Sequence, residues 1–387
     1  MMTTESDRPQ WIALRGFVAL AVAMGIGRFA FTPILPMMQD EFGLTVRDGG
    51  WLAAANYIGY FAGALSAMHR GIRPRHAIRL GLTVIALGTL AMAFFQSFAA
   101  WWFLRFLPGL ASAWVLVFTS AWALDQLSKA GRSALDGVVY AGVGSGIVFA
   151  GLICLVASHA HAGSGIAWAA MGIAALLAAV LLWPMASTDL TQAPAAPGAG
   201  GSIGATEFWR LVCCYGAFGL GYIIPATFLP VMAKQAIADP TAFGWAWPIF
   251  GAAAAVSTFF AARLSQAIGA RRVWAWGSLV MAAGVVAPLA VSGLPGIMLG
   301  ALCVGGTFMV NTMAGMQEAR RVAGTHARPV MAAMTSAFAA GQIVGPLLVS
   351  SIDARGGLAA ALIASAVLLC AAAGVLYATG GAREPQT

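Results

Sequence analysis

The chain has 387 residues, of which 60% are hydrophobic and only 9% are charged. Soluble domains carry roughly a quarter charged residues, so this composition excludes a soluble enzyme or binding module. High apolarity with few charges also excludes a disordered chain. The formal net charge of +8 does not by itself indicate nucleic-acid binding, because basic residues also mark the loops of membrane proteins.

Apolar runs close to the ~20 residues that a membrane-spanning helix needs recur along the whole chain. Six cover 11–36, 49–68, 77–96, 100–124, 137–157 and 165–186, and six more cover 209–232, 244–264, 273–293, 296–316, 329–351 and 357–379. The sequence therefore predicts an all-α polytopic membrane protein with twelve transmembrane helices. Its expected domains are two six-helix bundles, at 1–186 and 207–387, joined by a Pro-, Gly- and Ala-rich cytoplasmic linker at 187–206.

The distribution of basic residues predicts the orientation of these helices. With the N-terminus inside, most of the 21 Lys and Arg residues fall in inner loops, and only Arg47, Lys234 and Arg355 fall in outer ones. Lys and Arg accumulate in cytoplasmic loops, so we expect both termini in the cytoplasm. This topology accounts for the positive net charge, and we expect no nucleic-acid partner.

An internal repeat relates the two halves of the chain. A shift of 194 residues places Gly25 and Gly27 on Gly219 and Gly221, and continues into the next helix; the other matches are Leu35 with Leu229, Pro36 with Pro230, Met38 with Met232, and Gly50-Trp51 with Gly244-Trp245. One register over two helices indicates two pseudo-symmetric bundles in parallel orientation. Such halves enclose a midplane site in transporters that open alternately to each side.

Three segments resemble the major facilitator superfamily, in particular its YbfB/YjiJ-type branch of bacterial permeases. They are GIGRFAFTPILPMM in the first span, RFLPG in the fourth and GQIVGP in the eleventh. The fifth span is similar to the glycine-rich motif of antiporters, with Ile147 where the motif has Pro, and Ala67 stands where the loop signature after the second span has Asp. The resemblance implies the superfamily fold, a bacterial inner membrane and a small-molecule transporter without a cofactor.

Arg28 is the most informative residue, because it lies within the first span. An arginine at that depth is unfavourable by at least ~2.5–3.5 kcal/mol and must face protein, water or a ligand. A guanidinium offers a bidentate fork to carboxylate or phosphate, which predicts an anion-binding residue. The alternative is a structural arginine bonded to helix-end carbonyls, or one whose side chain snorkels outward to the membrane surface. Its repeat-related position holds Tyr222, which suits the facing wall of one cavity.

Further polar residues within spans are candidates for the same site or for bonds between helices. Arg105 follows Trp101-Trp102, so it either takes part in transport, as the resemblance implies, or has a structural role. Neither arginine has an acidic residue in mid-membrane to pair with, which favours an anionic substrate. The remaining substrate-binding candidates are Asn56, Tyr60, Asn311 and Gln342.

Asp125 and Glu318 occupy matching positions at the inner ends of the fourth and tenth spans. Each lies near basic residues, Lys129 and Arg132 or Arg320 and Arg321. They are expected to form a cytoplasmic gate or interfacial ion pairs. The alternative is that Glu318 carries a coupling proton.

The leading hypothesis is a secondary transporter, acting as a monomer, that moves a small organic anion by alternating access with a coupling proton or Na⁺. The alternative is a multidrug or metabolite exporter of the same fold, against which the lack of a mid-membrane acid argues. A membrane enzyme or receptor is a third hypothesis, but we find no HExxH, GxSxG or clustered His and Asp. We expect no catalytic residue, no metal and no cofactor.

Overall fold

The computed structural model describes residues 8–69, 71–184, 203–236, 244–351 and 357–379. Within these ranges the chain is helical apart from turns, as the sequence predicts. The hydrocarbon core of a membrane offers no water or other hydrogen-bond partner to the backbone, so each crossing satisfies its peptide groups internally as a helix.

The first half of the chain forms six crossings, the first of which is built from three consecutive pieces. These elements are α1 (Pro9–Leu20), η2 (Ala21–Phe29), α2 (Phe31–Phe42), α3 (Val46–Ala67), α4 (Pro74–Ala91), α5 (Phe98–Lys129), η3 (Ser133–Leu135), α6 (Asp136–His159) and α7 (Ser164–Leu182).

The second half also forms six crossings. These elements are α8 (Ala205–Ala236), α10 (Ala246–Ile268), α11 (Ala270–Ala290), α12 (Leu294–Ala323), η5 (Gly324–His326), α13 (Ala327–Ser351) and α14 (Gly357–Thr379). Most of the expected linker, residues 187–202, lies outside the described residues, and α8 begins inside its expected range, at Ala205.

Hydropathy and length alone identify nine spanning segments in the described residues, one of which, Leu294–Gly345, contains both α12 and most of α13. Helices α3 and α4 complete the set of twelve crossings but are less apolar. Their polar content has two origins. Asn56, Tyr57 and Tyr60 lie within α3, whereas Arg75 and Arg79 lie in the first two turns of α4.

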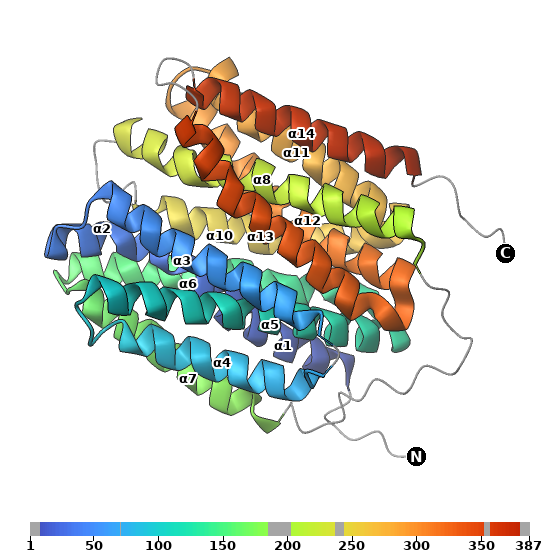
Figure 1. Cartoon of the computed structure of the whole chain (residues 1–387), viewed down its shortest axis with the longest axis horizontal. Helices are drawn as coiled ribbons and strands as arrows, with labels where there is room; N and C mark the ends of the chain where they lie inside the picture. Colours follow the sequence, from blue (N-terminus) through green and yellow to red (C-terminus); the bar gives the residue numbers. More distant parts are fainter. Residues whose placement is uncertain (1–7, 70, 185–202, 237–243, 352–356, 380–387) are drawn as a thin grey trace.

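The twelve crossings form two six-helix bundles that lie lengthwise side by side (Figure 1). Two pairs of helices make the main contacts between them, α3 with α13 and α6 with α10. The second pair approaches closely, since a Cβ built on Gly144 would lie 2.4 Å from the Gly251 carbonyl oxygen and 2.4 Å from the Ala255 nitrogen. Glycine therefore permits this backbone contact, as small residues do in membrane helix packing.

The helix ends carry ordinary capping signals. Thr45 and Asp48 form a capping box at the start of α3, and Pro9 and Pro74 occupy the first turns of α1 and α4. Gly43, with φ of 64°, ends α2 in the left-handed conformation. We call the end where α1 begins and α14 ends the terminal end, and the other the opposite end.

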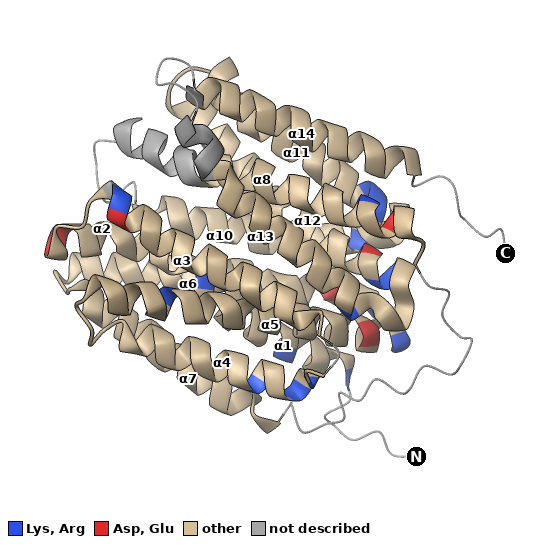
Figure 2. Cartoon of the chain, in the orientation of Figure 1, with Lys and Arg blue, Asp and Glu red and all other residues tan. Residues whose placement is uncertain are grey.

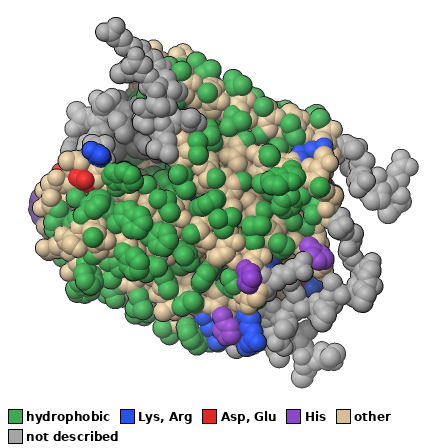
Figure 3. Space-filling view, in the orientation of Figure 1, with side chains coloured by type: hydrophobic (Ala, Val, Ile, Leu, Met, Phe, Trp, Pro, Cys, Tyr) green, Lys and Arg blue, Asp and Glu red, His purple; other side chains and the backbone are tan. Residues whose placement is uncertain are grey.

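Most charged residues lie at the two ends of the bundle, chiefly at the terminal end, and a few Lys or Arg residues lie between the ends (Figure 2). Apolar side chains cover most of the face shown in Figure 3. On the outer helices these side chains point away from the protein, for example Leu181 in α7, 73% exposed, and Phe260 in α10, 66% exposed. Such a belt suits contact with lipid tails.

Candidate functional site

The first crossing changes from α-helix to π-helix in its middle. The π-helical element η2 covers Ala21–Phe29 and carries Gly25, Gly27 and Arg28. Such helices are rare and occur frequently at functional sites. Irregular backbone at membrane depth is tolerated where it is buried in protein or lines a cavity. Residues 22–28 are all buried, so η2 satisfies that condition.

Side chains from two neighbouring helices bind the backbone of η2. Asn56 Nδ2 donates to the Gly27 carbonyl at 3.2 Å and to the Arg105 carbonyl at 3.0 Å. Arg105 Nη2 in turn donates to the Arg28 carbonyl at 3.3 Å. Asn56 and Arg105, both predicted to bind substrate, therefore contact the protein backbone on either side of Arg28. These contacts match the structural alternative that the sequence left open for Arg105.

Arg28 lies at the seam between the two bundles and is 3% exposed. Its Nη2 donates to Oε1 of Gln342, which comes from α13 in the second half. Its Nε and Nη1 have no hydrogen-bond partner among the described residues, and no described carboxylate pairs with it. A buried guanidinium thus keeps spare donors and no counter-ion within the described part of the chain.

Aromatic rings enclose the Arg28 guanidinium. Its Cζ lies 3.9 Å from the ring centroid of Tyr60, 5.6 Å from those of Tyr57 and Phe29, and 5.8 Å from that of Phe338. Ring faces stabilise a cation without neutralising its charge. Asn56 and Tyr60, one turn apart on α3, both contact η2.

Tyr222 lies on the second-half wall of the same region. It is 2% exposed, and its ring packs 5.2 Å from Phe308 and 6.2 Å from Phe338, the ring that also contacts Arg28. Arg28 thus contacts Tyr60 and Gln342 directly, and Phe338 lies between Arg28 and Tyr222. Positions 28 and 222, which the internal repeat relates to each other, therefore both lie close to the seam between the bundles.

Asn311 is not part of this group. It is fully buried on α12, and its Oδ1 would lie 2.1 Å from a Cβ built on Gly277 of α11, so its side chain faces the interior of the second bundle. Neither of its amide atoms has a hydrogen-bond partner among the described residues.

Asp125 lies at the terminal end and connects the two halves. Its carboxylate is 2.6 Å from Lys129 on the same helix and 3.7 Å from Arg320 on α12. The sequence placed Arg132 near Asp125 and Arg320 near Glu318, whereas in the structure Arg320 pairs with Asp125. Asp125 is 38% exposed, so this pair is accessible to water.

Glu318 belongs to a different network, inside the second bundle. Its Oε1 is 2.7 Å from both Arg271 Nε and Arg321 Nη2, and its Oε2 is 2.8 Å from Arg321 Nε. Arg271 also pairs with Glu207 and donates to the Thr379 hydroxyl at 3.0 Å. The sequence matched Asp125 with Glu318 by position, but their contacts differ. Arg271 and Glu207 were missed, because their partners lie on other helices.

Two further contacts join the halves at the terminal end, and the sequence pointed to neither. Gln317 Nε2 donates to Asp136 at 2.8 Å, and Asp136 is 3% exposed. Arg328 donates to the Ile72 carbonyl at 3.2 Å and to the His69 carbonyl at 3.4 Å. Asp136 is the first residue of α6. Its burial depends on how closely α6 and α12 approach each other, which the sequence does not reveal.

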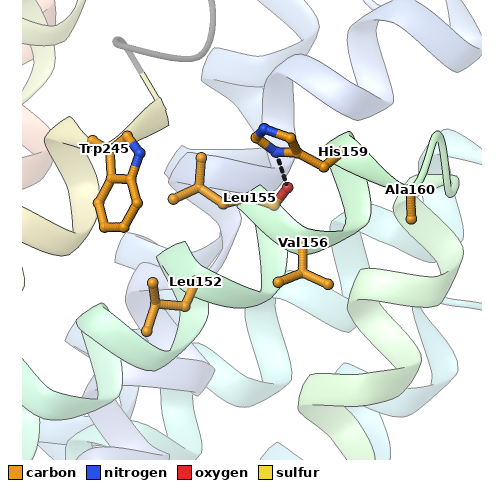
Figure 4. Close-up of a pocket in the computed structure, with 6 residues that line it drawn as sticks. All are labelled: Leu152, Leu155, Val156, His159, Ala160 and Trp245. Carbon is orange, nitrogen blue, oxygen red and sulfur yellow. Dashed lines mark hydrogen bonds between the residues drawn. The ribbon is translucent and has the colours of Figure 1, made fainter.

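Two cavities on the surface of the described residues differ from this seam in chemistry. One, of about 540 Å³, lies between α6 and α10 and is lined by Leu152, Leu155, Val156, His159, Ala160 and Trp245 (Figure 4). Its His159 ring nitrogen is 2.9 Å from the Leu155 carbonyl oxygen. The other, of about 390 Å³, lies among α3, α8 and α13. Neither is lined by a charged Lys, Arg, Asp or Glu side chain.

The amino-acid sequence matches a known protein family. Residues 20–377 match the model of a family described as the uncharacterised MFS-type transporter YbfB. The chain belongs to this family of the major facilitator superfamily. The resemblance of its first, fourth and eleventh spans is thereby confirmed, and the chain is a membrane protein of a transporter family.

One relative is similar to part of this chain in sequence, and two solved structures are similar to it in fold. The uncharacterized MFS-type transporter YceJ of Bacillus subtilis (strain 168) is 28% identical over 101 residues, which are 26% of this chain and 26% of that protein. The human organic anion transporter MFSD10 (TETRAN) has a TM-score of 0.74 at 14% identity, covering 95% of this chain and 99% of that one. FucP in the outward conformation has a TM-score of 0.72 at 16% identity, covering 96% and 99%. At these identities the two structures show the fold alone.

Proposed function

We propose that this chain is a secondary transporter that carries a small organic anion across the membrane by alternating access, with Arg28 as the residue that binds the anion. The observation that carries the proposal is the buried guanidinium at the seam, which has spare donors and no carboxylate partner among the described residues. An uncompensated charge in an apolar interior is unfavourable. A carboxylate entering the seam supplies the missing charge and accepts the free N–H groups.

The neighbours of Arg28 divide into two roles. Tyr60, Gln342 and Tyr222 form walls that a bound solute touches. Asn56 and Arg105 act as positioning residues, because their donors are directed to the carbonyls of Gly27, Arg28 and Arg105 itself. They fix η2 and thereby the direction of the Arg28 side chain. Asn311 faces Gly277 within the second bundle, so we omit it from the binding group.

Movement between the halves would use the contacts at the terminal end. We assign the domains to residues 1–186 and 207–387, joined by the linker 187–206. The Asp125–Arg320 and Asp136–Gln317 contacts cross between them and must break when that end opens. Glu318 holds the second bundle together and does not form part of this gate.

The concentration of basic residues at the terminal end supports an orientation with both termini in the cytoplasm of a bacterial plasma membrane. We propose that the chain acts there as a monomer and that a proton or Na⁺ drives the transport cycle. A solute carrier of this kind needs no cofactor and performs no covalent chemistry.

One of the solved structures with the same fold is described as an organic anion transporter. That description concerns the human protein. It agrees with the proposal, which depends on Arg28 and not on the likeness of fold. A multidrug exporter that binds lipophilic cations would instead need an acidic residue near this position, and no described carboxylate pairs with Arg28.

The test is binding and uptake by the purified chain. Thermal unfolding is followed with a panel of carboxylates and with tetraphenylphosphonium as a lipophilic cation, because a ligand that binds the folded state raises its stability. We expect stabilisation by carboxylates, and uptake into proteoliposomes that Arg28→Ala abolishes and Arg28→Lys partly retains. Stabilisation by the cation alone, or normal uptake by folded Arg28→Ala, would contradict the proposal.

A further inference from the structure

The ring of Phe29, next to Arg28, is the point where the first half meets aromatic residues of the second. Its centroid lies 5.8 Å from Phe308 in an edge-to-face contact with an interplanar angle of 81°, and 6.5 Å from Trp247. Phe29 thus joins the cation to the rings of α10 and α12.

Four rings of the second half stack in a series that we call the aromatic row, made of Trp247, Phe250, Phe308 and Tyr222. Trp247 and Phe250 lie 5.4 Å apart at 7°, Phe250 and Phe308 5.4 Å apart at 20°, and Phe308 and Tyr222 5.2 Å apart at 20°. The row starts in the first turn of α10 and reaches the middle of α8. Consecutive rings are nearly parallel and cover one another's inner faces, so a flat group would pack against the uncovered edges and outer faces of the row, as Phe29 packs edge-to-face against Phe308.

The polar groups around Arg28 are few. Arg105 also has no described carboxylate partner, and its Nε has no hydrogen-bond partner among the described residues, but its Nη2 donates to the Arg28 carbonyl and its guanidinium packs 4.5 Å from the Phe31 ring, so we place it outside the binding group. The other polar groups next to Arg28 are the Gln342 amide and the hydroxyls of Tyr57 and Tyr60. A polyol would need many more hydrogen bonds, and a dianion would need a second cation whose donors are directed to the ligand and not to the backbone.

We infer that the substrate is a monocarboxylate with a flat aromatic body, whose carboxylate binds Arg28 and whose ring stacks between Phe29 and the aromatic row. This inference rests on the proposed function and names its substrate class. On entry the ring replaces the contact between Phe29 and Phe308, and the carboxylate accepts hydrogen bonds from Nε and Nη1 of Arg28. The carboxylate thereby meets the free N–H donors of Arg28, and the ring meets the aromatic side chains beside it.

The test compares probes that differ in one property. Benzoate is the reference; cyclohexanecarboxylate keeps the charge and bulk but is not aromatic; benzamide keeps the ring but has no charge; terephthalate adds a second charge. Dissociation constants are measured by isothermal titration calorimetry on the purified full chain. We expect benzoate to bind about threefold to tenfold more tightly than cyclohexanecarboxylate, the difference that ring stacking supplies. Benzamide and terephthalate should bind more weakly than either.

Phe308→Leu assigns the preference to the aromatic row. It keeps an apolar side chain but removes the ring, so the ratio of benzoate to cyclohexanecarboxylate affinity should fall to about one. Phe260→Leu is the matched control, because Phe260 is 66% exposed on the outer face of the helix that carries Phe250. This control should keep the preference. Should Phe308→Leu fail to fold, the wild-type probe series alone still decides.

The outcomes separate this inference from the proposed function. Equal affinity for benzoate and cyclohexanecarboxylate, or a preference that persists in Phe308→Leu, overturns the inference while an Arg28-dependent anion transporter remains. Carboxylate binding that is unaffected by Arg28→Ala overturns both. Tighter binding of terephthalate than of benzoate also contradicts the inference, because it requires a second available cation.

Discussion

Arg28 and Arg271 are both more than nine-tenths buried, at 3% and 7% exposure, yet their surroundings differ in charge. Arg271 pairs with two carboxylates, Glu207 and Glu318, and with the Thr379 hydroxyl. Arg28 has one neutral amide partner, Gln342, and a set of ring faces. A compensated buried cation holds helices together, whereas Arg28, with two free donor nitrogens and no described carboxylate, could accept an anion. The comparison therefore separates a structural arginine from the arginine that we propose binds the substrate.

The largest effect on stability is expected for Arg271→Met. Removing this cation leaves Glu318, which is fully buried, with Arg321 as its remaining partner. Breaking a buried ion pair from one side typically lowers the free energy of unfolding by about 3–5 kcal/mol. Unfolding of the purified chain would measure the loss, with Arg272→Met, a half-buried neighbour, as control. Equal stability of the two variants would show that the network is not structural.

Arg28→Gln should show the reverse pattern. No described carboxylate loses a partner, so we expect the free energy of unfolding to change by less than about 1 kcal/mol. Hydrogen bonds to charged groups contribute about 1.5–3 kcal/mol, so anion affinity should fall roughly tenfold to hundredfold. Calorimetric binding and thermal unfolding of the same sample measure both quantities. A severe loss of stability with anion binding retained would place Arg28 in the same class as Arg271.

The next contrast concerns two buried asparagines. Asn56→Leu removes the donors to the Gly27 and Arg105 carbonyls and should lower the free energy of unfolding by about 1–3 kcal/mol. Asn311→Leu removes a side chain with no hydrogen-bond partner among the described residues, so its stability should be unchanged or higher. Uptake should fall in Asn56→Leu and persist in Asn311→Leu. Loss of uptake in a stable Asn311→Leu would return Asn311 to the binding group.

The smallest effect is expected at the terminal end. Asp125→Asn removes half-exposed ion pairs with Lys129 and Arg320, and such pairs contribute about 0.2–1 kcal/mol. Uptake should change by no more than about fivefold, and raised salt should reduce the difference from the wild type, because salt screens exposed charges. A complete loss of transport would give Asp125 a direct part in coupling.

The twelve crossings and the burial of Arg28 within the protein could be predicted from the sequence, because both depend on the cost of placing polar groups in lipid. The internal repeat pointed to Tyr222 as a residue of the wall facing Arg28. The partners of Glu318, the inward direction of Asn311 and the burial of Asp136 could not be predicted, because they depend on the rotation and crossing of helices far apart in sequence. The π-helical turn at Ala21–Phe29 has no local signature beyond its glycines.

The claim that Arg28 is uncompensated is tested most directly by Gln342→Glu, which places a carboxylate on the partner that already accepts its hydrogen bond. The measurement is the thermal unfolding midpoint with and without benzoate, with Gln126→Glu on α5 as the matched control. The account predicts a higher midpoint without ligand and no further rise with benzoate, whereas the control keeps the wild-type response. A full benzoate response in folded Gln342→Glu would contradict it.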